Sequence, residues 1–181
     1  GSGRRTFTAL ATARTLVLEM DNRGFEAELS TMEEAYRAGV GMAIFNADGL
    51  VLLAERIDNP GAWQMPQGGI EDNEDPEAAV FREMEEEVGT RKATILHIID
   101  EWIYYDFPPY LCSRIFDGKY RGQRQKWIAL RFIGEDSDIS LCAHSDPEFS
   151  RWKWVTIDKM LETVPHFKRA AYERVMKEFA A

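Results

Sequence analysis

The sequence predicts a single α/β domain built on a mixed β-sheet, and three observations support this. Its 181 residues are enough for one domain with a sizeable core. A hydrophobic content of 45% with 12% aromatic residues is typical of a globular protein. Short β-rich segments outnumber helical ones and surround one well-marked helix over residues 75–89, which favours helices packed on a sheet.

The central helix carries clear signals at both ends. Asp75 is a good N-cap, and Pro76 occupies the first helical position, where a missing N–H costs nothing. Gly89 supplies the end of the helix. Apolar residues recur at every fourth position and should pack against the sheet; they are Val80, Met84 and Val88.

Before this helix, the sequence predicts two strands and a glycine loop. Apolar residues 40–45 and 50–54 flank a turn that ends in Asp48-Gly49, a composition typical of hairpins. Residues 63–69 then lead into the helix. We expect Pro66 to Gly69 to form a tight loop, because paired glycines permit positive φ and close backbone approach.

The second half of the chain is expected to add strands first and then two helices. In chain order, the expected segments are a β-rich stretch over 93–105, a break at 107–109, a loop over 110–125, a strand over 126–133, a strand end over 152–155, and helices over 157–163 and 167–179.

The N-terminal residues differ in composition from the rest. Residues 1–3 read as a cloning remnant, and residues 4–18 contain three Arg, four Thr and no acidic residue. This composition indicates either the end of an organellar transit sequence or an ordinary strand centred on residues 15–18. We therefore expect an N-terminal extension over residues 1–35, which could bind a protein partner, and a catalytic domain over 36–181.

Composition also bounds the compartment. No apolar run approaches the ~20 residues of a membrane span, so no membrane partner is expected. Cys112 and Cys142 lack metal or redox spacing and read as reduced cysteines. The predicted location is intracellular, either cytoplasmic or organellar (mitochondrion or chloroplast).

The acidic charge of the chain is concentrated in and before the central helix. Residues 71–87 hold nine acidic residues and one basic residue, a net of −8 in a chain of net −9. Glu83, Glu86 and Glu87 fall on one helix face with no cation among them, although like charges at that spacing repel. Bound divalent cations are the simplest counter-charge.

These residues resemble the Nudix box, the signature of hydrolases that act on nucleoside diphosphate linkages. The matching positions are Gly68, Glu74, Arg82-Glu83, Glu86-Glu87 and Gly89; Thr90 departs from the usual aliphatic residue. The resemblance implies the Nudix fold, a mixed sheet sandwiched between helices. It also implies that the Gly68 carbonyl binds metal, that Glu74 pairs with Arg82, and that more than one Mg²⁺ or Mn²⁺ ion is used.

Hydrolysis of a pyrophosphate linkage needs charge neutralisation, an activated water and a held leaving group. Divalent cations bound to carboxylates meet all three needs. Glu83, Glu86 and Glu87 would supply hard oxygen ligands, and either Glu86 or Glu87 could also accept the proton of the attacking water.

Outside the box, the chain is similar to one branch of the family. That branch holds bacterial RNA 5′-pyrophosphohydrolases and plant-type asymmetric diadenosine tetraphosphate hydrolases. The segments that carry this similarity are 36–41, 63–69, 105–109, 122–127, 147–149 and 167–169. The resemblance implies that Glu148 is a further metal ligand or candidate base; otherwise Glu148 is an exposed loop acid.

Basic and aromatic residues outside the box are candidates for substrate binding. Residues 118–134 contain five cations and no acid. Tyr105 and Phe167 could stack on bases or belong to the core. The cations expected to neutralise phosphates are Arg37, Arg56, Lys126 and Lys168.

The sequence therefore favours a metal-dependent pyrophosphohydrolase that converts 5′-triphosphate RNA to 5′-monophosphate RNA. The alternative is the asymmetric hydrolysis of diadenosine tetraphosphate to ATP and AMP, or of a related nucleoside polyphosphate. A Nudix-fold subunit without catalysis would be expected to have a broken box, and this box is intact.

Overall fold

The computed structural model describes residue 24 and residues 26–180 of the chain. One mixed sheet dominates it, with a strand order of β3-β2-β1-β7-β5 and with β4, β6 and β8 paired to β1, β7 and β2. The strands are β1 (Tyr36–Phe45), β2 (Val51–Arg56), β3 (Trp63–Gln64), β4 (Gln67–Gly69), β5 (Ala93–Ile98), β6 (Ile103–Asp106), β7 (Gly122–Phe132) and β8 (Phe149–Val155).

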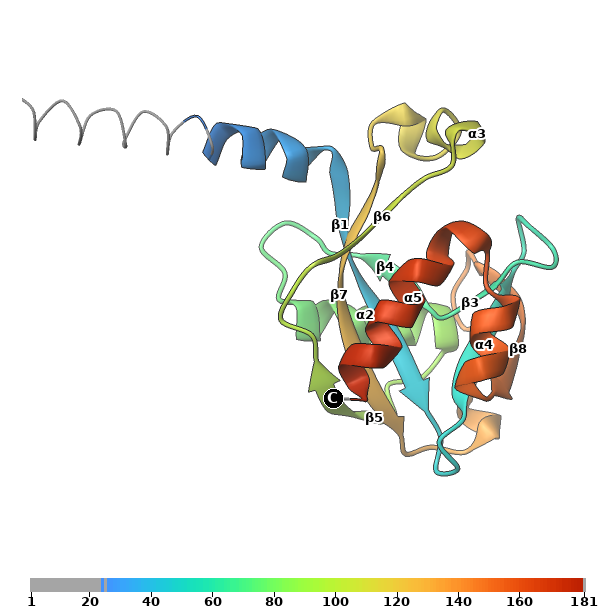
Figure 1. Ribbon diagram of the computed structural model, residues 1–181. Coiled ribbons are helices and arrows are strands. Elements are labelled where there is room, and N and C mark those ends of the chain that lie inside the picture. Colours follow the sequence, from blue (N-terminus) through green and yellow to red (C-terminus); the bar gives the residue numbers. More distant parts are fainter. Residues whose placement is uncertain (1–23, 25, 181) are drawn as a thin grey trace, which may run out of the picture.

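Helices cover both faces of this sheet, as expected (Figure 1). Helix α2 packs on one face and helices α4 and α5 pack on the other. The helical segments are α2 (Pro76–Val88), α3 (Pro109–Cys112), α4 (Ile157–Thr163) and α5 (His166–Phe179), with short 3-10 turns η1 (Phe116–Gly118) and η2 (Asp136–Asp138). The predicted layers of helix, mixed sheet and helix are therefore confirmed.

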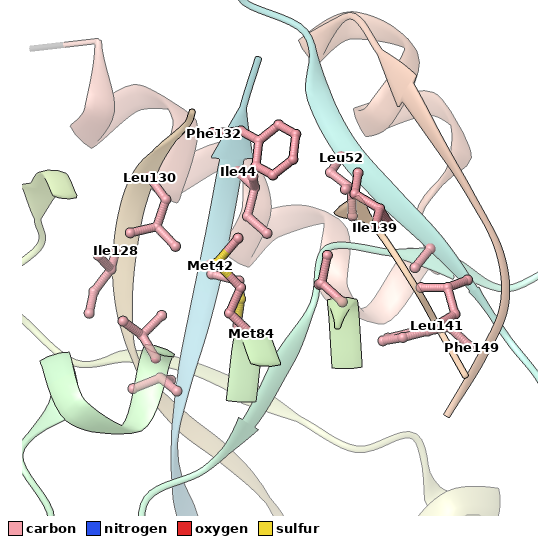
Figure 2. Close-up of a cluster of buried hydrophobic side chains, with 14 of the residues drawn as sticks. Met42, Ile44, Leu52, Met84, Ile128, Leu130, Phe132, Ile139, Leu141 and Phe149 are labelled. Atoms are coloured by element: carbon pink, nitrogen blue, oxygen red, sulfur yellow. The ribbon is translucent and has the colours of Figure 1, made fainter. Parts of the chain in front are cut away.

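The two cores follow from the alternation of side chains along the strands. Val40, Met42 and Ile44 of β1 point to α2, whereas Ala43 lies in the core under α4 and α5. Figure 2 shows the α2-side core, in which Met84 of the helix meets Met42. Each face of the sheet is thus closed by an apolar helix surface.

The partner of β1 changes along its length, and this change places the site. The first half of β1 pairs with β4 at residues 39–41, and only its last residue, Phe45, pairs with β2. Along its other edge, β1 runs parallel to β7 over its whole length. The edge of β1 is therefore split between β4 and β2.

The glycines before α2 do not form the expected loop. Gln67–Gly69 is strand β4, and the described glycines with positive φ lie elsewhere, at positions 49, 61, 89 and 118. What Gly68 and Gly69 supply is room: a Cβ on Gly68 would collide with the Glu83 carboxylate, and one on Gly69 with the Arg37 guanidinium. The expected close approach is present, but the positive-φ prediction was wrong.

Two strands begin earlier than expected, and the first of them, expected over residues 40–45, begins at Tyr36. The loop expected over residues 110–125 ends earlier, because β7 begins at Gly122 and pairs there with both β1 and β6. Pairing on both sides satisfies the backbone of residues 122–125, although their polar sequence lacks the apolar character of a central strand.

The N-terminal predictions lie partly outside the described residues, including the possible strand at 15–18. Residues 26–34 are helical and lead directly into β1. Within the described part of the chain, no helix combines the length and apolar character needed to cross a membrane.

Candidate active site

Helix α2 places three glutamates beside β4. Asp75 caps the helix by accepting a hydrogen bond from the Glu77 N–H (2.8 Å), and Gly89 ends it in a left-handed conformation. The apolar stripe is fully buried, so the rotation of the helix about its axis is fixed. Glu83 and Glu87 are consequently only 9% and 6% exposed, whereas Glu86 is half-buried.

Arg82 ties the segment before the helix to the helix itself. Its guanidinium donates to both carboxylate oxygens of Glu74 (2.8 Å each) and to the Gly69 carbonyl (2.8 Å). It also donates to Glu83 Oε1 (2.7 Å) and lies 3.6 Å from Glu86. The expected pair of Glu74 and Arg82 is thus a two-pronged one, and it lowers the pKa of Glu74 to about 2, chiefly through hydrogen bonds from Arg82.

Glu87 is the most buried acid of the site. Its Oε2 accepts a hydrogen bond from the Gln67 backbone N–H (3.0 Å). Burial, followed by repulsion from Glu148 and Glu83, raises the pKa of Glu87 well above its ordinary value. One N–H and the charge of Arg56 offset only part of that cost.

Glu83 lies over the Gly68 backbone, where only glycine leaves room for a carboxylate. Burial raises its pKa, and repulsion from Glu86 and Glu148 acts in the same direction. The neighbouring Arg82 opposes this rise in pKa but does not overcome it, so Glu83 lacks sufficient positive charge around it.

Glu148 reaches the same region from the start of β8. It lies on the loop before Phe149, is about half exposed, and approaches Arg56 Nη1 at 3.3 Å. Arg56 also forms a two-pronged pair with Asp58 (2.7 and 2.8 Å). The structure therefore brings Glu148 into electrostatic range of Glu83 and Glu87, although about 60 residues separate them in sequence.

The donor set fits a hard divalent cation. Within residues 26–180, no three acidic, imidazole or thiol groups converge closely enough to hold an ion as the side chains stand. Each acid instead meets a protein partner: Glu83 meets Arg82, Glu148 meets Arg56, and Glu87 meets the Gln67 N–H. Buried carboxylates with raised pKa values nevertheless lack counter-charge, and oxygen ligands of this kind suit Mg²⁺ and Mn²⁺.

Gly68 lies where close packing requires glycine. It pairs with β1, where a Cβ on Gly39 would press against the Gly68 carbonyl oxygen. The two glycines therefore allow β4 to lie close to β1 and Glu83 to lie close to the Gly68 backbone.

The α5 side presents a buried cation. Lys168 is 5% exposed and its ammonium donates to Gln64 Oε1 (2.7 Å) and Gln67 Oε1 (3.0 Å). Burial, followed by the charge of Arg56, lowers the pKa of Lys168 to about 7, while Glu87 and Glu148 act in the opposite direction. A bound phosphate would add the negative charge that this lysine lacks.

Two of the aromatic candidates lie beside Lys168. Tyr105 is buried, its hydroxyl accepts a hydrogen bond from the Gln67 side chain (3.2 Å), and its ring packs on Phe107 and Phe167. This favours the core alternative for Tyr105, because its ring faces are already covered. Phe167 is half-buried and keeps part of its ring accessible.

Three of the four cations expected to bind phosphate lie together, and the fourth lies apart. Arg37, Arg56 and Lys168 lie around β4 and the split edge of β1. The side chain of Lys126 lies on the face of β7 opposite to that of Trp127. Its ammonium donates to the Asp100 carbonyl and lies 5.1 Å over the Trp102 ring. Lys126 is therefore not brought together with the other three.

Sequence reasoning missed a network of four glutamines, in which Gln64, Gln123 and Gln125 are buried and Gln67 is half-buried. Gln67 joins both sides of the site: its backbone N–H contacts Glu87, and its side chain contacts Lys168, Tyr105 and Gln123. Gln125 donates to Gln123 (2.8 Å), and Gln64 accepts from Lys168. The available signal was the two-residue spacing of Gln123 and Gln125, which places two polar side chains on one buried strand face.

Comparisons with known proteins agree with this geometry. The family model for the NUDIX domain matches residues 35–179. The chain is 51% identical to the RNA pyrophosphohydrolase of Rhodospirillum rubrum, covering 84% of this chain and 92% of that protein. It is 46% identical to the RNA pyrophosphohydrolase of Gluconacetobacter diazotrophicus, covering 80% and 92%. The E. coli dihydroneopterin triphosphate pyrophosphohydrolase shares the fold, with a TM-score of 0.62 at 22% identity over 77% of this chain and 96% of that one.

Proposed function

The chain belongs to the Nudix family of hydrolases, and on this basis we propose that it converts the 5′-triphosphate end of RNA to a 5′-monophosphate. The observation that carries this proposal is the similarity to RNA pyrophosphohydrolases over almost their full length. The geometry supports it, because buried acids on one side of β4 and a buried lysine on the other suit a cation-bound polyphosphate.

Mg²⁺ or Mn²⁺ held by Glu83, Glu86, Glu87, Glu148 and the Gly68 carbonyl would neutralise phosphate oxygens and acidify the attacking water. We propose that more than one ion is used, because four carboxylates exceed what a single small cation needs. Glu74 and Arg82 act indirectly: they hold Glu83 and the Gly69 carbonyl in register with the helix.

Glu87 is better placed than Glu86 to accept a proton from the attacking water. It is the more buried of the two, so its carboxylate has less freedom to move. The Gln67 N–H orients one oxygen of Glu87 and leaves the other free to face the water.

Lys168, Arg56 and Arg37 would hold the phosphates that the ions do not reach. Lys168 is held by amide groups, Arg37 lies over an aromatic ring and Arg56 is paired with carboxylates, so little ordering remains to be done when an anion binds. Phe167, half-buried beside Lys168, is the candidate for stacking on the first base.

We further propose that residues 36–181 are the hydrolase domain and residues 1–35 an extension that can bind a partner protein. The family match to residues 35–179 supports this boundary. Within the described residues, the extension touches the domain through an ion pair between Glu33 and Arg124 (2.9 Å).

A competition between two substrates tests the proposed function. Purified protein is given 5′-triphosphate RNA or diadenosine tetraphosphate in parallel, with Mg²⁺ and then Mn²⁺, and kcat/KM is measured for each. We expect RNA to give the higher value and a 5′-monophosphate end. A higher value for diadenosine tetraphosphate would overturn the substrate assignment, and no turnover of either would overturn the enzymatic one.

A separate measurement tests the ion site. Titration with Mn²⁺, followed by electron paramagnetic resonance, reports free and bound ion without any turnover. We expect Glu83→Gln and Glu87→Gln each to weaken binding, with Glu85→Gln, an exposed acid on the same helix, as the matched control. Unchanged Mn²⁺ binding in both variants would remove these acids from the ion site.

A further inference from the structure

The loop between β6 and β7 places an aromatic ring directly behind the site. The Arg37 guanidinium lies against Gly69 of β4, and on its other side it covers the Phe116 ring at 4.5 Å. Phe116 in turn lies 5.9 Å from the Tyr120 ring and 6.3 Å from the Phe107 ring. A chain of contacts therefore leads from the strand beside the catalytic acids to a group of aromatic rings.

This ring is held outward by an unusual backbone. Phe116, Asp117 and Gly118 have φ values of 53°, 55° and 72°, so three consecutive residues are left-handed. Left-handed conformations are unfavourable for non-glycine residues, because the Cβ atom comes too close to the following carbonyl oxygen. The loop bears this cost at two positions, and the large apolar side chain it presents is still 38% exposed. Strain combined with an exposed aromatic ring indicates a functional surface rather than core packing.

The same loop is positively charged in a strongly acidic protein. Residues 107–121 contain Arg114, Lys119 and Arg121 but only one acid, Asp117. Lys119 lies 5.1 Å over the Tyr120 ring. Among the described residues, neither Arg114 nor Lys119 forms an ion pair, so both cations are available to an external anion.

We propose that Phe116, Tyr120, Arg37 and Lys119 form a platform that binds the unpaired RNA nucleotides behind the triphosphorylated end. This inference rests on the proposed function, and it assigns a second contact region to the same substrate. Aromatic faces accept any base by stacking, Lys119 neutralises the linking phosphates, and Arg37 joins the platform to the phosphates of the 5′ end. Single-stranded RNA presents bases and phosphates alternately along its length, and the platform likewise places aromatic and cationic side chains next to one another.

The platform lies next to the strand that the terminal phosphates have to reach. The terminal phosphates have to meet Glu83 and Glu87 at β4, and Gly69 of β4 is where Arg37 begins the path to Phe116. Figure 1 shows the α3 segment beyond the end of β6, past one end of the sheet. The nucleotides that follow the 5′ end would therefore pass along this loop.

The test compares RNAs of increasing length. The 5′-triphosphate substrates have one, two, three, four and eight nucleotides, and kcat/KM is measured for each with wild type and with Phe116→Leu, which keeps an apolar side chain but removes the ring. We expect wild type to gain kcat/KM over the first nucleotides. Phe116→Leu should reduce that gain about fivefold or more, the lower end of base–aromatic stacking.

Tyr110 supplies the matched control. It is an aromatic residue on the same loop and is 66% exposed, and within the described chain no aromatic or cationic partner covers its ring. Tyr110→Leu should match wild type on every substrate. Equal thermal midpoints for the two variants and wild type show that the loop substitution does not act through unfolding.

Direct binding separates this inference from the proposed function. Fluorescence anisotropy with an eight-nucleotide single strand bearing a 5′-monophosphate needs no turnover. We expect weaker binding by Phe116→Leu than by Tyr110→Leu, and loss of this difference when the 5′ nucleotides are paired in a duplex.

Two results would overturn the platform. One is equal binding and equal length dependence in Phe116→Leu and Tyr110→Leu. The other is a loss in Phe116→Leu that is as large for diadenosine tetraphosphate as for long RNA, since the ring would then hold only the nucleoside next to the phosphates. Absence of RNA turnover by wild type would instead refute the proposed function, and the anisotropy result would still decide the platform.

Discussion

The two sides of the site differ in how the chain builds them. On the α2 side, Arg82, Glu83, Glu86 and Glu87 lie within six consecutive residues of one helix, and Arg82 forms ion pairs with Glu83 and Glu86. On the α5 side, Lys168 meets Gln64 and Gln67 from segments about 100 residues away, and neutral amides hold it. The α2 side is thus built from neighbouring residues joined by ion pairs, whereas the α5 side is built from distant segments joined mainly by neutral groups.

The same physical cause acts on both sides with opposite signs. Burial raises the pKa of Glu83 and Glu87, and burial lowers the pKa of Lys168. Each side therefore holds charge that the protein alone does not compensate. A cation-bound polyphosphate offers positive charge to the acids and negative charge to the lysine, so it relieves both costs at once.

The strongest test of this contrast is Glu87→Gln. Glutamine keeps the size of the side chain and an oxygen that can accept the Gln67 N–H, but it removes the charge and the base. We expect kcat to fall about 10²- to 10⁴-fold, the usual range for a positioned proton acceptor. The thermal midpoint should hold or rise, because an uncompensated buried charge is lost.

Glu85→Gln is the control for this variant. Glu85 is exposed, and its only described ion pair is with Arg91 at 3.4 Å. Its kcat should stay within about twofold of wild type, as for most surface substitutions. A drop in kcat as large as that of Glu87→Gln would mean that the net charge of the helix matters, and not the position of Glu87.

Arg82→Lys tests the local ionic order of the α2 side. Lysine keeps the charge but cannot donate to both Glu74 oxygens and to Gly69 and Glu83 together. We expect the free energy of unfolding to fall by about 2 kcal/mol, less than for a fully buried pair because both partners are partly exposed. Activity should fall about tenfold as Glu83 loses its position.

The acid range makes this test sharper. The pKa of Glu74 is about 2 in the folded protein against an ordinary value of 4.5. The stability from this pair is therefore present above about pH 4.5 and is lost as pH falls towards 2. Urea unfolding between pH 6 and pH 3 should show a shallower loss for Arg82→Lys than for wild type, with Arg91→Lys, an exposed arginine, as the control. Parallel curves for all three proteins would contradict it.

The contrast also explains what the sequence could predict. The α2 side lies in one stretch with helical spacing, so the cap, the apolar stripe and the acid face were all readable from Asp75 to Gly89. The sequence did not indicate that Gly68 and Gly69 lie in a strand. These glycines leave room for Glu83 and Arg37, and neither residue is their neighbour in the sequence.

The α5 side was readable only through the family resemblance. Lys168, Gln64 and Gln67 meet through tertiary packing, and no local pattern predicts such a meeting. Lys126 shows the same limit in reverse: its sequence context resembled a phosphate contact, but the alternation of β7 turns its side chain to the other face. Tyr105 likewise belongs to the core, because its ring packs against the rings of Phe107 and Phe167.

Glu148→Gln tests the one acid on the α2 side that comes from a different segment of the chain, the loop before β8. Glu148 is about half exposed and meets Arg56 at 3.3 Å, so its removal should cost little stability. We expect kcat to fall about tenfold, with weaker Mn²⁺ binding measured by electron paramagnetic resonance. Asp146→Asn, on the same exposed loop, should change neither quantity. If both variants behave as wild type, Glu148 is an ordinary surface acid.

The last effect is expected on the α5 side, in the pH dependence of KM. The pKa of Lys168 is about 7, so its charge is lost as pH rises through that value. With saturating divalent ion, KM for triphosphate RNA should rise about tenfold between pH 6.5 and pH 9, the worth of one charge-assisted hydrogen bond. Lys168→Met should show the high KM at every pH, with kcat changed far less.

Stability supplies an independent check with a definite sign. The folded pKa of Lys168 lies below its ordinary value of 10.5, so between pH 7 and pH 10.5 the unfolded chain binds more protons at this residue. The contribution of Lys168 to stability therefore increases with pH across that window. Unfolding free energies of wild type relative to Lys168→Met should rise from pH 7 to pH 10, and Lys177→Met, on the last turn of α5, should show no such trend. A flat difference for Lys168→Met would mean that this lysine keeps an ordinary pKa, and that the α5 side does not hold uncompensated charge.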